Sequence, residues 1–175
     1  MQNVEIKTEL RDLEAARACC RSIGARYIGQ LDQTDTYYKL PDGRLKRREC
    51  VGEPTEWIFY HRHDRIRPTL SSFTILDDRA ARDRWSVTGL DPWLVVRKTR
   101  DLWMIENVRI HLDEVDELGL YFELEALVDK HFPVKECQIK IAHLQEQFGP
   151  VLGEPIAVGY CDLLAGGPLP HPDES

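Results

Sequence analysis

The chain has 175 residues, of which 42% are hydrophobic, and it carries a formal net charge of −7. This length supports one domain with a real core and leaves little room for two. The acidic balance argues against general nucleic-acid binding, which needs a cationic surface to neutralise phosphates.

The N-terminus and the cysteines indicate in which kind of cellular environment the protein is found. The N-terminus has no apolar leader, and no run approaches the roughly 18 apolar residues of a membrane span, so we expect no membrane partner. The five cysteines include no Cys-x-x-Cys pair, and their odd number argues against a disulfide framework or a zinc site. They are typical of reduced thiols, which predicts a cytoplasmic protein.

The first part of the chain alternates apolar and polar residues. The alternation predicts strands over residues 4–7, 33–40, 44–49 and 56–62. Between the first two, Asp12 as an N-cap, apolar residues at helical spacing and Gly24 as a stop predict a helix. A Pro-Asp-Gly turn at residues 41–43 joins two of the strands, so the later three are expected to form an antiparallel meander.

The second part continues the pattern. It predicts strands over residues 73–76, 94–100, 107–115, 121–128 and 156–160. A short helix is expected over 77–85, and a longer one over 133–148, where Pro133 suits the first turn and Gly149 ends the pattern. We expect a single domain over residues 1–165 and a disordered Pro- and Gly-rich tail over 166–175.

Charged residues recur at every second position of these strands, and their signs segregate by strand. The cations are Arg44, Lys46, Arg48, Arg62, Lys98 and Arg100, and the carboxylates are Glu5, Glu123 and Glu125. In an open sandwich the polar faces would mix both signs. If the sheet closes into a barrel whose apolar outer face is covered by helices, the charged faces line a tunnel. Such a tunnel would hold a polyanion such as triphosphate, with Mg²⁺ or Mn²⁺ on the carboxylates.

Seven segments occur in the order found in CYTH-domain proteins. They are Val4 to Lys7, Gln33 to Tyr38, Gly43 to Glu49, Ile58 to Arg62, Val96 to Arg100, Asn107 to Glu114 and Phe122 to Glu125. The chain most resembles the class IV adenylyl cyclase branch of the triphosphate tunnel metalloenzymes. The segment from Gly159 to Leu164 also resembles that branch. The resemblance implies an α+β fold: a closed, eight-stranded antiparallel β-barrel with helices packed on the outside.

The resemblance and the strand faces agree on the roles of the charged residues. The candidate metal ligands are Glu5, Asp113, Glu123 and Glu125. The candidate phosphate contacts are Lys7, Arg44, Lys46, Arg48, Arg62, Lys98, Arg100 and Arg109. Arginine suits bidentate phosphate contact, and lysine acts as a point charge. Glu5 and Lys7 are the candidate catalytic residues. By contrast, His61, His63 and His111 lack a metal-ligand spacing and are interpreted as surface or packing residues.

Three functions fit this interpretation. The resemblance implies a cyclase that converts ATP to cyclic AMP and pyrophosphate, or alternatively a triphosphatase that hydrolyses tripolyphosphate or an organic triphosphate with Lys7 as a base. A non-catalytic polyphosphate- or nucleotide-binding module is the third. It is favoured by Asn3, which stands where the family pattern Glu-x-Glu-x-Lys has its first acid and brings no charge to a metal. A homodimer is common among such relatives.

Overall fold

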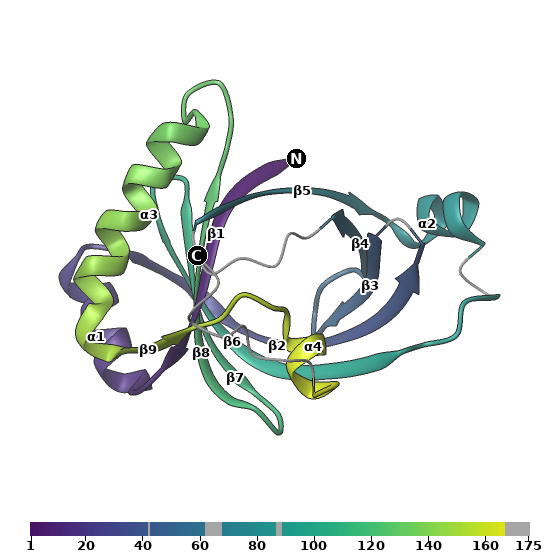
Figure 1. Ribbon diagram of the computed structural model, residues 1–175, viewed down its shortest axis with the longest axis horizontal. Coiled ribbons are helices and arrows are strands. Elements are labelled where there is room, and N and C mark those ends of the chain that lie inside the picture. The colour runs from purple at the N-terminus through teal and green to yellow at the C-terminus, as the bar shows by residue number, and fades with distance from the viewer. Residues whose placement is uncertain (42, 62–67, 87–88, 167–175) are drawn as a thin grey trace.

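The structure is a computed structural model that describes residues 1–41, 43–61, 68–86 and 89–166, and its strands curl into a closed barrel (Figure 1). The barrel strands are β1 (Gln2–Leu10), β2 (Arg26–Leu40), β3 (Gly43–Cys50), β4 (Glu56–His61), β5 (Thr69–Leu76), β6 (Leu94–Ile105), β7 (Val108–Val115) and β8 (Gly119–Leu127). They follow the order β5-β4-β3-β2-β6-β7-β8-β1, and antiparallel pairing of β1 with β5 closes the circle. The predicted fold class is confirmed.

Strand β7 illustrates why the sheet closes with its polar face inward. Val108, Ile110 and Leu112 are buried on the outer side of the barrel, where they join the main hydrophobic core. Arg109 and His111 alternate with them and face the lumen. Successive side chains of a strand point to opposite faces, so an apolar outer face needs a cover from other elements.

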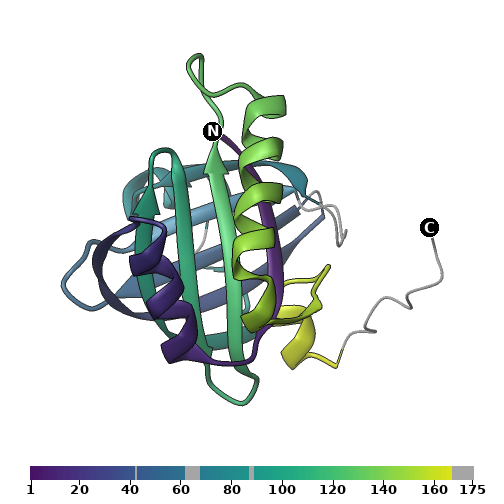
Figure 2. The same cartoon turned by 90° about the vertical axis from the view of Figure 1, so that its left-hand side faces the viewer.

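Two helices supply that cover. Helix α1 (Leu13–Ser22) begins after Asp12, whose side chain accepts a 2.9 Å hydrogen bond from the backbone N–H of Ala15, as its N-cap position predicts. Helix α3 (Val134–Phe148) lies across β1 and β8, and α1 lies beside it (Figure 2). Phe148 of α3 packs on Phe122 of β8 with ring centroids 4.7 Å apart. The main core therefore lies between the helices and the outside of the barrel.

A smaller helix and the C-terminal segment cover other parts. Helix α2 (Asp78–Trp85) packs on β4 and β5. Strand β9 (Leu152–Pro155) pairs with β1 outside the barrel after a 3-10 turn, η2 (Gly149–Val151), and helix α4 (Tyr160–Leu164) follows. No helix among the described residues is both long and apolar enough to cross a membrane.

The predicted strand over residues 156–160 is wrong. The strand lies earlier, at β9, and Tyr160 begins α4. The three consecutive apolar residues Ile156, Ala157 and Val158 are all buried, so they do not alternate between two faces as strand residues do. Ile156 and Val158 pack instead with residues near the ends of β2, β6, β7 and β8. Residues 167–175 of the predicted tail lie outside the described residues.

Burial of the apolar face of α3 should dominate its contribution to stability. Ile141 is fully buried, whereas Ile139 on the same helix is 61% exposed. We expect Ile141→Ala to lower the free energy of unfolding by about 2–5 kcal/mol, because it leaves a cavity in the main core. Urea unfolding followed by circular dichroism measures this. The matched control Ile139→Ala makes the same change in helix propensity, so an equal loss in both variants would contradict the proposed packing.

Candidate functional site

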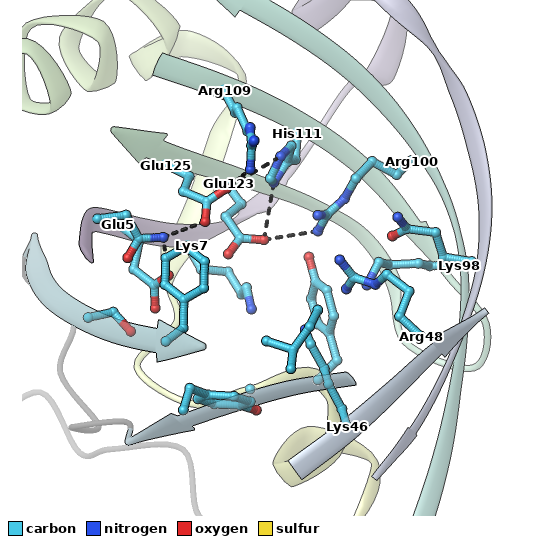
Figure 3. Close-up of a pocket in the computed structure, with 18 of the residues that line it drawn as sticks. Glu5, Lys7, Lys46, Arg48, Lys98, Arg100, Arg109, His111, Glu123 and Glu125 are labelled. Carbon is cyan, nitrogen blue, oxygen red and sulfur yellow. Dashed lines mark hydrogen bonds and ion pairs between the residues drawn. The ribbon is translucent and has the colours of Figure 1, made fainter. Parts of the chain in front are cut away.

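The barrel encloses a cavity of about 380 Å³ lined by side chains of opposite charge. The predicted site residues that line it are Glu5, Lys7, Lys46, Arg48, Lys98, Arg100, Arg109, Glu123 and Glu125. Figure 3 shows four cations, Lys46, Arg48, Lys98 and Arg100, on one side and the three glutamates on the other. Arg62 lies outside the described residues. The sign segregation in the sequence thus becomes two walls of one cavity.

The cationic wall is organised by Asp35, which the sequence interpretation did not select. This aspartate is fully buried on β2, directly opposite Arg48 of β3, and its two oxygens accept 2.7 Å hydrogen bonds from the Arg48 Nε and Nη2. Its Oδ2 atom also lies 3.1 Å from the Lys98 Nζ and 3.6 Å from the Lys46 Nζ. One carboxylate therefore anchors three cations, and the cluster keeps a net positive charge toward the cavity.

The pKa values of this cluster follow from burial and charge. Burial alone would raise the pKa of Asp35, but the surrounding cations hold it well below its usual value. Burial lowers the pKa of Lys98 to about 7, despite the opposing charge of Asp35. Burial and the neighbouring Arg48 lower the pKa of Lys46 to about 8. The two lysines therefore titrate close to neutral pH, whereas Arg48 stays charged.

Asp113 is the buried counter-charge of Arg100, as Asp35 is of Arg48. The two residues lie opposite each other on β7 and β6, and both Asp113 oxygens accept 2.7 Å hydrogen bonds from the guanidinium. The Tyr160 hydroxyl donates a third, at 2.6 Å. Burial would raise the pKa of Asp113, but Arg100 lowers it to about 2. Asp113 was a candidate metal ligand, and the structure places it behind Arg100, outside the set of residues that line the cavity.

The anionic wall brings like charges into register. Glu5 of β1 lies directly opposite Glu125 of β8, and the next inward pair is Lys7 with Glu123. Like charges at directly opposed positions repel each other. The Asn3 amide donates hydrogen bonds to both Glu5 and Glu125, which partly offsets this repulsion. The charge of Lys7 helps hold the pKa of Glu123 well below its usual value against the effect of burial.

His111 lies in this wall, and its interpretation as a surface or packing residue missed that. It stands opposite Glu123 in the β7–β8 register and is 4% exposed. Its Nδ1 lies 3.5 Å from Glu123 Oε2, and its Nε2 lies 4.0 Å from Glu125 Oε2. Burial and the charge of Arg100 lower its pKa, which favours the neutral imidazole. The sequence did contain a signal for this position. His111 lies two positions after Arg109, so both side chains point to the same inward face of the strand.

Arg44, a predicted phosphate contact, pairs with the C-terminal helix and not with the residues that line the cavity. Its guanidinium pairs with Asp162 of α4 and lies near the Cys161 sulfur. It does not line the described cavity. The C-terminal segment also reaches the cavity through Tyr160, whose ring lies 4.0 Å from the Lys7 Nζ and 5.5 Å from the Lys98 Nζ. Arg44 therefore fixes the helix that presents Tyr160.

The anionic wall has the chemistry of a divalent cation site. Glu5, Glu123 and Glu125 offer carboxylate oxygens, the ligands that Mg²⁺ and Mn²⁺ take. Two buried atoms beside them, Asn3 Oδ1 and His111 Nδ1, have no hydrogen-bond partner among the described residues. In the portion of the chain described, no three His, Cys, Asp or Glu side chains are yet arranged as a metal site. The donor types, carboxylate oxygen and imidazole nitrogen, are ones that divalent cations take.

The chain is similar to known proteins in sequence and in fold. The model of the CYTH domain family matches residues 1–154. A relative named putative adenylate cyclase, from Methanocaldococcus jannaschii, is 25% identical over 134 residues, which cover 71% of this chain and 77% of that protein.

Solved structures show the same fold. A putative adenylate cyclase from Vibrio parahaemolyticus is 18% identical with a TM-score of 0.72, over 93% of this chain and 97% of that one. A putative adenylyl cyclase from Hippeastrum, described as having a dominant triphosphatase activity, is 14% identical with a TM-score of 0.59, over 96% and 98% of the two chains.

Removing the anchor of the cationic wall should destabilise the protein. We expect Asp35→Asn to lower the free energy of unfolding by about 3–5 kcal/mol, because Arg48 and two lysines lose their buried counter-charge. Denaturant unfolding at pH 7 measures it. Asp32→Asn, at an exposed position of the same strand, is the matched control and should change stability by less than about 0.5 kcal/mol. Equal effects would show that Asp35 is not the anchor.

Proposed function

The chain belongs to the CYTH family, and from this membership and the charges of its cavity we propose that it is a metal-dependent enzyme acting on triphosphates. The activity we propose first is conversion of ATP to cyclic AMP and pyrophosphate, the activity suggested by the names of its relatives. In that reaction the ribose 3′-oxygen bonds to the α-phosphorus while the bond from that phosphorus to the bridging oxygen breaks. The hydroxyl proton passes to a base.

The observation that carries this proposal is the sharing of Asp35 among three cations. Lys46, Arg48 and Lys98 bring three potential positive charges to one carboxylate. Arg100 adds its guanidinium at the same wall, with Asp113 behind it and Glu123 3.0 Å away. A chain of phosphates supplies the missing negative charge, and a preformed cationic wall stabilises the charge that develops on the leaving pyrophosphate.

The opposite wall would hold the cation. Glu5, Glu123 and Glu125 are the proposed ligands of Mg²⁺ or Mn²⁺, which when bound supplies positive charge to the phosphates and lowers the pKa of the attacking hydroxyl. Lys7 and Arg109 lie along this wall and are proposed to contact the phosphate groups. Lys7 is also the proposed base in a hydrolytic reaction, with Glu5 beside it as the second catalytic residue.

Part of the cavity favours an organic triphosphate over an inorganic one. Strands β4 and β5 contribute Ile58, Phe73 and Ile75 to the lining. Phosphates gain nothing from apolar side chains, whereas a nucleoside buries apolar surface against them. An inorganic or organic triphosphatase remains the alternative, since the cationic wall would hold its substrate equally well. Asn3 favours a non-catalytic binding module, because it leaves the anionic wall one carboxylate short of the family pattern.

We also propose a cellular compartment, a substrate class and an oligomeric state for this protein. All five cysteines are free thiols, which supports a reducing, cytoplasmic environment. The net charge of −7 and the enclosure of the cations within the barrel favour a small-molecule triphosphate over a nucleic acid. A homodimer is proposed by analogy with relatives of this kind.

Product analysis separates the proposed functions. Purified protein is incubated with ATP, and separately with tripolyphosphate, in Mg²⁺ and in Mn²⁺, and products are resolved by ion-exchange chromatography. We expect cyclic AMP with pyrophosphate from ATP, abolished in Glu123→Gln and preserved in the control Glu114→Gln, which alters an exposed carboxylate of β7. Orthophosphate from tripolyphosphate would instead indicate the triphosphatase. Thermal stabilisation by tripolyphosphate without any product would indicate the binding module.

Binding of an anion should be coupled to proton uptake by Lys98. Bound phosphate favours the charged ammonium, so the pKa of Lys98 should rise from about 7 in the free protein. Above that pH, binding takes up a proton at Lys98, and this uptake should contribute a fall in affinity of at most about tenfold per pH unit.

Calorimetric titration with tripolyphosphate in EDTA from pH 6 to 9 tests this coupling. Lys98→Met should flatten the slope between pH 7 and 8. The control Lys135→Met, at an exposed position of α3, should retain the wild-type slope. Identical slopes in wild type and Lys98→Met would exclude Lys98 as the proton acceptor, since protonation of the ligand itself is common to all three proteins.

A further inference from the structure

We propose that His111 is a nitrogen donor to the divalent cation held by Glu123 and Glu125, and that the site therefore prefers a first-row transition-metal ion to Mg²⁺. This inference rests on the proposed function, because it concerns the cation of the same site. It adds a ligand that lies on a different strand from the three glutamates (Figure 3).

The position of the imidazole is the first argument. His111 is fixed opposite Glu123 by the β7–β8 register, and Arg109 stands opposite Glu125 in the same way. A single cation can bind only one nitrogen of an imidazole ring. The Nδ1 of His111 lies 3.5 Å from Oε2 of Glu123. Two donors bound to one cation at about 2.1 Å are about 3 Å apart when adjacent and about 4 Å apart when opposite. The backbone therefore already brings His111 within the span of a shared cation.

The unmet bonding capacity of the side chain is the second argument. The His111 side chain is 6% exposed, and its Nδ1 lies 3.5 Å from Glu123 Oε2, which is longer than an ordinary hydrogen bond, with no closer partner among the residues described. A buried polar atom without a partner costs free energy, and native proteins seldom tolerate it without a reason. Asn3 Oδ1 beside the same glutamates is also buried without a partner. The Asn3 amide nitrogen donates to Glu5 and Glu125, so it is the His111 nitrogen that a cation on these carboxylates would satisfy.

The residue type sets the metal preference. Mg²⁺ takes oxygen ligands and retains its waters, whereas imidazole nitrogen suits first-row transition metals. A neutral imidazole is the form that binds a metal. His111 would also replace the one carboxylate ligand that the site loses through Asn3, without adding its negative charge. The mixed nitrogen and oxygen donor set should therefore discriminate against Mg²⁺.

Metal binding without substrate provides the test. Electron spin-echo envelope modulation of the protein with one equivalent of Mn²⁺ should show coupling to a directly bound ¹⁴N nucleus, and titration should give a lower Kd for Mn²⁺ than for Mg²⁺. His111→Gln should abolish the coupling and weaken Mn²⁺ binding by about 10- to 100-fold with little change for Mg²⁺. The control His143→Gln, at an exposed position of α3, should leave both measurements unchanged.

Several results would overturn the inference. They are absence of nitrogen coupling in the wild-type protein, persistence of that coupling in His111→Gln, or an equal loss of Mn²⁺ and Mg²⁺ affinity in that variant. The wild-type spectrum decides the question even if the variant does not fold. Product formation by an enzyme that binds Mn²⁺ without nitrogen coupling would reject His111 as a ligand and leave the proposed function standing. Absence of both metal binding and product would reject both.

Discussion

The barrel depends on two buried aspartates that allow cations to face its interior. A lone charge taken out of water costs several kcal/mol even after relaxation, so a wall of cations needs fixed counter-charges. Asp35 and Asp113 supply them, and each lies directly opposite an arginine on the neighbouring strand, Arg48 and Arg100. Both pairs are bidentate, with donor and acceptor 2.7 Å apart. The geometry that stabilises the charges also fixes the register of β2 with β3 and of β6 with β7.

The alternation of residue types predicted the walls of the cavity but not what lies behind them. A period of two assigns each residue to a face, and the segregation of signs then favours a closed barrel over an open sheet. Which inward residues reach the lumen depends on side-chain length and on their neighbours. The side chains of Asp35 and Asp113 are shorter than those of the arginines they bind, and neither aspartate lines the cavity. Asp113 therefore does not lie with the three glutamates as a metal ligand. A one-dimensional pattern contains no information on such depth.

The C-terminal segment marks another limit of prediction from sequence. Alternation fails where a segment is buried on all sides, and Ile156, Ala157 and Val158 are such a segment. Ile156 and Val158 pack with residues from four strands, and Tyr160, which follows them, lies against Lys7 and donates a hydrogen bond to Asp113. The family model ends at residue 154, so this part of the cavity lies beyond the matched domain. The diversion of Arg44 to Asp162 follows from the same packing.

The charges of the cavity are segregated between its two walls, and a ligand that carries both signs complements both walls. The cationic wall carries more positive charge than Asp35 neutralises, while Glu5 and Glu125 face each other across β1 and β8. A phosphate chain alone would relieve the first wall and a metal ion alone the second. A metal–triphosphate complex relieves both at once, and its two parts bind each other. Each component should therefore strengthen the binding of the other, because the walls lie on opposite sides of one small cavity. Repulsion between like charges lowers the stability of the free protein. Relief of this repulsion adds to the binding free energy of the metal–triphosphate complex.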